Sequence, residues 1–133
     1  MATGEAGGAP ATLPDALPPS LPDDIIDLIH CLGFVYLRHG QANRAVVLLI
    51  IAAQDAPDRV DVLRTLAAAL IAAGLGQQAL DVLDRITGLT PQEAGHPMIR
   101  LMRARALLLL GERDEARSVF RALPGDTLGS AAA

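Results

Sequence analysis

Three histidines, one cysteine and a group of aspartates are the side chains of this chain best suited to chemistry. His30, His39 and His96 fall on separate predicted elements, with no cysteine or carboxylate at the spacing of metal ligands. Cys31 follows His30 directly, but sequence neighbours on a helix point in different directions, so we predict a buried structural thiol. These residues predict no metal site.

The aspartates and the glycines have structural explanations. Asp23, Asp24 and Asp27 come at the start of a predicted helix, where carboxylates favour the positive end of the helix dipole. The glycines stand singly in predicted turns, and none forms a phosphate-binding loop. The sequence therefore predicts no catalytic residue and no cofactor, and a protein that is not an enzyme.

The elements that position these side chains follow a repeat. Gly40 and Gly74 are 34 residues apart, which is the period of the tetratricopeptide repeat, a helix–turn–helix unit. The same interval separates Ala45 from Ala79, Leu49 from Leu83, and Pro57 from Pro91. A third copy reaches its turn glycine at Gly111, 37 residues after Gly74, which predicts a three-residue insertion near 90–97.

The residue types in the first copy suit a pair of crossing helices. Gly33 is small where the two helices approach closely, and Tyr36 and Leu49 fill the space between them. Gly40 ends the first helix in a conformation that a side chain would resist, and Pro57 lies where the second helix stops. We predict an all-α fold of three tandem tetratricopeptide-like repeats forming a short right-handed solenoid.

The predicted boundaries divide the chain into a leader, a repeat domain and a tail. Residues 1–19 are rich in Ala, Gly and Pro and are expected to be disordered, and residues 124–133 form a flexible tail. The repeat domain spans 20–123, with repeats at about 26–59, 60–93 and 97–123. The six expected helices cover about 22–38, 42–55, 59–73, 77–88, 97–109 and 113–123. The start of the fifth helix is left open, because Gly95 and Pro97 interrupt that stretch.

Composition narrows the class of protein. At 133 residues the chain is one domain, and its 51% hydrophobic residues suffice for a core of aliphatic side chains. The net charge of −4 argues against nucleic acid as the main partner. One cysteine suits a reducing compartment, and no apolar run reaches the roughly 18–20 residues that would span a bilayer. We expect a cytoplasmic protein with no direct membrane insertion.

The repeat register predicts which side chains face a protein partner. In tetratricopeptide arrays the first helix of each repeat lines a concave groove, which suits a partner segment with apolar anchors and a few acidic or carbonyl groups. The predicted groove positions are His30, Phe34, Leu37, Arg64, Ala68, Ile71, Leu101, Arg105 and Leu108. This set does not match the Lys/Asn clamps that grip a C-terminal carboxylate. The alternative is that several of these residues merely pack between helices.

The second predicted helix is too apolar for a free surface. Residues 45–53 are nine apolar residues in a row, and Val47, Ile50 and Ile51 fall where such helices usually carry polar side chains. An exposed patch of this kind marks an interface with a partner or a second copy. The alternative is that the N-terminal segment, for example through Leu13, Leu17 or Leu21, folds back over it. The last predicted helix instead has a polar outer face and is expected to cap the array.

Beyond the repeats, the chain resembles the small tetratricopeptide-like chaperones of bacterial type III secretion, most closely the YscY/SctY group. The stretch that resembles them runs from about Leu28 to Leu123. The residues that carry the likeness lie at 32–33, 36–37, 40–45, 48–49, 91–95, 103–105 and 111–117. The Ala/Pro-rich leader departs from the compact pattern of that group.

The resemblance implies a function. Such a protein would bind a small secreted SctX-like protein in its groove, keep it soluble, and help to deliver it to the cytoplasmic domain of the SctV-like export gate. Related chaperones hold needle subunits or translocators, so another cargo stays open, as does a homodimer of the free protein. A generic tetratricopeptide scaffold shares every repeat feature, whereas a helix–turn–helix DNA-binding regulator is disfavoured because no helix has a basic face.

Overall fold

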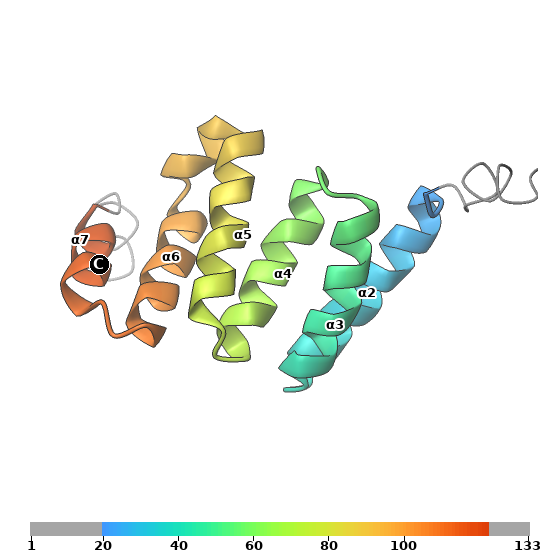
Figure 1. Ribbon diagram of the computed structural model, residues 1–133, viewed down its shortest axis with the longest axis horizontal. Helices are drawn as coiled ribbons and strands as arrows, with labels where there is room; N and C mark the ends of the chain where they lie inside the picture. Colours follow the sequence, from blue (N-terminus) through green and yellow to red (C-terminus); the bar gives the residue numbers. More distant parts are fainter. Residues whose placement is uncertain (1–19, 123–133) are drawn as a thin grey trace, which may run out of the picture.

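The computed structural model describes residues 20–122, which form α-helices joined by short connections. The helices pack as consecutive neighbours and lie side by side in one row, from α2 and α3 at one end to α7 at the other (Figure 1). The elements are α2 (Asp23–Arg38), α3 (Ala42–Asp55), α4 (Val60–Ala72), α5 (Gly76–Leu89), the 3-10 helix η1 (Pro91–Gly95), α6 (Pro97–Leu109) and α7 (Arg113–Arg121).

The pairs α2–α3, α4–α5 and α6–α7 are three helix–turn–helix units. In each pair the first helix ends in the same hydrogen-bonded turn around a glycine with positive φ, namely Gly40 (φ 75°), Gly74 (φ 80°) and Gly111 (φ 79°). In the first unit Gln41 N–H donates to Tyr36 C=O at 2.9 Å, and Gly40 N–H donates to Leu37 C=O at 3.2 Å. This is the Schellman pattern, which closes the carbonyls left free at a helix end.

The core runs along the inside of the row and is made of aliphatic side chains. Ile26, Leu49, Leu63, Leu83 and Ile99 are among its largest fully buried members, and they come from five successive helices. No residue of α7 joins this central cluster within the part of the chain that the structure describes. The last helix is therefore attached at the edge of the core.

Gly33 shows why the first unit needs a small residue at the helix crossing. A Cβ added to Gly33 would lie 2.8 Å from Cγ of Leu49, closer than carbon atoms approach. Leu49 is itself fully buried, so it has no free space to move into. The predicted close approach of the first two helices is thus present, with Tyr36 half-buried beside it.

The connections differ in length as the sequence indicates. Residues 56–59 join α3 to α4, whereas residues 90–96 join α5 to α6 and contain η1. The longer connection holds the three additional residues, and α6 begins at Pro97, which settles the start of the fifth helix. Each observed helix lies within two residues of its expected bounds. The leader 1–19 and the tail 124–133 lie outside the described residues.

Candidate functional site

The first helices of the three units lie beside one another, since α4 contacts both α2 and α6. We call the surface formed by α2, α4 and α6 the first-helix face. Residues predicted for the groove come from these three helices, so the fold brings their elements together. The burial and the polar contacts of these side chains differ from one residue to the next.

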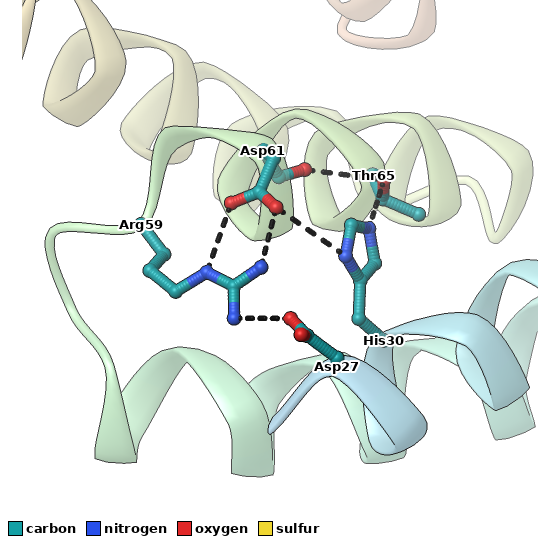
Figure 2. Close-up of polar contacts among 5 residues, drawn as sticks. All are labelled: Asp27, His30, Arg59, Asp61 and Thr65. Atoms are coloured by element: carbon teal, nitrogen blue, oxygen red, sulfur yellow. Dashed lines mark hydrogen bonds and ion pairs between the residues drawn. The ribbon is translucent and has the colours of Figure 1, made fainter. Parts of the chain in front are cut away.

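A polar cluster joins α2 to the start of α4 (Figure 2). The Arg59 guanidinium donates to both carboxylate oxygens of Asp61, at 3.2 Å from Nε and 2.6 Å from Nη2. Its third nitrogen, Nη1, lies 2.6 Å from Oδ1 of Asp27 on α2. Arg59 therefore ties two carboxylates from different helices, and the paired geometry is the strong form of an Arg–carboxylate contact.

This pairing shifts the pKa values of both partners. The hydrogen bond from Arg59, opposed by partial burial, lowers the pKa of the Asp61 carboxyl below its usual range. Hydrogen bonds to Asp61 and Asp27 raise the pKa of the Arg59 guanidinium, which stays charged in any case. The cluster is thus a fixed, ionised junction and offers no group poised for acid–base catalysis.

His30 belongs to the same junction. Its Nε2 lies 2.8 Å from Oγ1 of Thr65, and that hydroxyl donates to the backbone carbonyl of Asp61 at 3.2 Å. Because the hydroxyl donates its one hydrogen to that carbonyl, its oxygen accepts from Nε2–H of His30. Nδ1 faces Oδ2 of Asp61 at 3.7 Å. His30 therefore links α2 to α4 and is only partly available to a partner.

The two predicted groove arginines have different surroundings. Nη2 of Arg64 lies 3.1 Å from Oε1 of Glu93 on η1, so an intramolecular carboxylate already occupies it. Arg105 on α6 is exposed. Arg105 is therefore the better placed of the two to meet an acidic group of a partner.

The apolar groove positions divide by exposure. Phe34 and Leu108 are 47% and 56% exposed, on the first and third units. Leu37, Ala68 and Leu101 are half-buried. The first-helix face thus presents one large apolar side chain toward each end.

Ile71 was predicted to line the groove, but the structure places it in the core. It is only 6% exposed and belongs to the central core, so it offers a partner almost no surface. The repeat register places it on the same side of α4 as Arg64, but neighbouring helices close over it. A charge at this position would therefore unfold the chain before it tested binding.

The second patch predicted from the sequence lies on α3. Val47, Ile50 and Ile51 are all exposed, with Val47 at 60%. Val47 lines a hollow of about 480 Å³ between α2 and α3 that also contains Leu32 and Tyr36. Ile50 instead lines a hollow of about 520 Å³ bordered by α3, α4 and α5. The patch is therefore shared between two depressions.

Cys31 was predicted to be buried, and this is wrong. Its side chain is exposed on α2. Within residues 20–122, no three His, Cys, Asp or Glu side chains gather closely enough to hold a metal ion. No helix in the same range is both long and apolar enough to cross a membrane.

Sequence reasoning missed the Arg59 junction. It assigned Asp27 to the helix dipole, whereas Asp27 pairs with Arg59, a residue in the next interhelical connection. The available signal was a basic residue at the end of the 56–59 connection, one repeat away from an acidic first turn. Glu93 was missed for a similar reason, since its position depends on the inserted η1 segment.

Comparisons with known proteins agree with this architecture. The family model described as tetratricopeptide repeat matches residues 36–96. A solved structure named MamA MSR-1 C2 is similar, with a TM-score of 0.64 and 25% sequence identity over 81% of this chain. This chain spans 59% of the length of that structure. No curated protein matches. The chain thus has the tetratricopeptide-repeat fold, a scaffold for protein–protein interaction.

Proposed function

We propose that this chain is a cytoplasmic type III secretion chaperone of the YscY/SctY kind, which binds a small secreted SctX-like protein. The observation that carries the binding step is the first-helix face, where Phe34 on α2 and both Arg105 and Leu108 on α6 are exposed. An amphipathic helix with apolar anchors and an acidic residue complements these side chains. The likeness of residues 40–45 and 111–117 to the secretion chaperones supports the choice of partner.

The proposed mechanism is capture without turnover. The partner's apolar side chains would cover Phe34 and Leu108, and the partner would stay soluble until it reaches the SctV-like export gate. The exposed Val47, Ile50 and Ile51 on α3 would extend the contact. Delivery to the gate would make the protein peripheral at the export apparatus.

Co-expression with the small open reading frames next to its gene tests the proposal. We expect one small protein to co-purify as a complex of defined mass by size exclusion and light scattering. If the product that co-purifies is a needle subunit or a translocator, the mechanism stays the same and the cargo differs from the SctX-like protein. Failure of every neighbouring product to co-purify would leave only the generic scaffold.

Two variants locate the binding face. Phe34→Asp and Leu108→Asp replace exposed apolar side chains, so helicity should be kept while capture weakens by about tenfold or more for each. Leu89→Asp is the matched control, because Leu89 is also exposed but lies on α5, outside the first-helix face. Equal loss of capture in all three variants would contradict the assignment of the face.

A further inference from the structure

Helix α2 carries a second apolar surface, separate from the first-helix face. Leu28, Leu32 and Val35 are 63%, 44% and 47% exposed, and Ile25 continues the same line toward the start of the helix. The intervals along this line are three, four and three residues. That alternation places the four side chains on one stripe of the helix, at the a and d positions of a heptad pattern.

The position of α2 in the row explains why the stripe is uncovered. On its inner side α2 packs against α3 and α4, which bury Ile26 and Gly33. No further described helix follows on the outer side (Figure 1). A stripe with heptad spacing is the shape that packs against another helix along its length. A helix is therefore the occupant that this surface fits.

The stripe itself is suited to its own copy, because large aliphatic residues occupy every a and d position. We propose that α2 pairs with α2 of a second copy, in antiparallel orientation, to form a dimer.

Charge sets the orientation. In the antiparallel register, Leu28 faces Leu32 of the second copy and Ile25 faces its Val35, so each layer joins an a residue to a d residue. Asp24 near the start of α2 then lies beside Arg38 near the end of the second copy's α2. In a parallel pair the g residue Asp24 would instead face the e residue Ile29 and would gain no ion pair.

The two-fold axis of this dimer passes close to Cys31. Cys31 is exposed, borders the stripe near its middle, and is the single cysteine of the chain. Each copy therefore brings one thiol to the centre of the interface. Phe34 lies on α2 away from the stripe, so the dimer leaves the first-helix face open, and the inference does not rest on the proposed function.

The first test is the mass of the full-length chain in solution. Light scattering across a dilution series should give a dimer that dissociates on dilution. Leu28→Asp combined with Leu32→Asp should raise the dissociation constant at least about a hundredfold, while Leu89→Asp, on α5, leaves it unchanged. A wild-type monomer at every concentration, or a dimer indifferent to the double substitution, would overturn the proposal.

The second test addresses the orientation without disturbing the stripe. Asp24→Arg or Arg38→Asp alone should weaken the dimer several-fold, and the two together should restore it. A short bismaleimide should join two Cys31 thiols into a covalent dimer of wild type, and not of the Leu28/Leu32 double variant. Absence of both rescue and cross-linking would refute the antiparallel pair. A dimer that appears only after removal of residues 1–19 would show that the leader covers the stripe.

Discussion

The two ends of the helical row present different kinds of side chain. At the first end, α2 exposes Leu28, Leu32 and Val35, while its inner side joins the central core. At the other end, α7 exposes charged residues along Arg113–Arg121 and contributes nothing to that core. A repeat array is soluble as a single molecule when its terminal helix has a polar outer side. By that criterion α7 is the more polar of the two ends, although its Phe120 is also exposed.

Equivalent repeat positions in the first and third units also differ in burial. Leu49 in the first unit and Phe120 in the third occupy equivalent places in the repeat, yet Leu49 is fully buried and Phe120 is 42% exposed. Phe120 lines a small hollow with Leu108 and Ala116, flanked by Arg113 and Arg117. At this repeat position the first unit is therefore better packed than the third.

The largest expected effect on stability comes from replacing Leu49 or Phe120 by alanine, one at a time. Leu49→Ala leaves a cavity in a closed core and should lower the free energy of unfolding by about 2–5 kcal/mol. Phe120→Ala should cost less than about 2 kcal/mol, because much of the ring already contacts solvent. Urea denaturation followed by circular dichroism measures both. Equal losses would mean that the two ends are packed alike.

A smaller effect is expected at the helix crossing of the first unit. Gly33→Ala introduces a methyl group 2.8 Å from Cγ of Leu49, which should destabilise the chain by about 1–3 kcal/mol. Gly88→Ala on α5 is the control, since nothing lies within 4 Å of its added Cβ. It should be neutral or stabilise by up to about 1 kcal/mol, because alanine is the better helix former. Thermal melting of both variants measures these changes. Equal stability of the two would mean that the helix crossing at Gly33 tolerates a methyl group.

The smallest effect concerns the ion pairs near the two ends. Asp61→Asn removes one side of the Arg59 junction and should cost about 0.5 kcal/mol, because the pair is partly exposed. Asp114→Asn breaks the largely exposed contact with Arg117 and should leave stability unchanged.

The pH dependence follows from the direction of the Asp61 shift. A carboxyl whose pKa is lowered in the folded state stabilises it above the unfolded pKa, near 3.9. That contribution disappears as pH falls through the lower, folded value. Stability measured between about pH 6 and pH 2 should therefore fall less in Asp61→Asn than in wild type, and a parallel decline would contradict the assigned role.

The repeat period made the fold predictable. Gly40, Gly74 and Gly111 mark turns that only a residue tolerant of positive φ can occupy, so their spacing set the helix bounds and the insertion before α6. A requirement for positive φ is met by the residue type at a single position. It does not depend on what packs around that position, and so the sequence alone was sufficient.

The candidate site was less predictable, because exposure depends on neighbours. Phe34 and Ile71 share a repeat-based prediction, yet one is exposed and the other is core. Cys31 was predicted to be buried from its helix context, yet its side chain is exposed. Arg64 was predicted for the groove, but Glu93 on η1 pairs with it. The differences at Ile71 and Arg64 arise from contacts between elements distant in sequence.

Tyr36 has a practical consequence for following these differences by spectroscopy. It is the single tyrosine of a chain without tryptophan, and it lies in the hollow between α2 and α3. Intrinsic fluorescence therefore reports on one end of the row alone, whereas circular dichroism averages over all helices. If α7 detaches before α2 and α3 separate, the two signals will change at different denaturant concentrations, and no label is needed to see it.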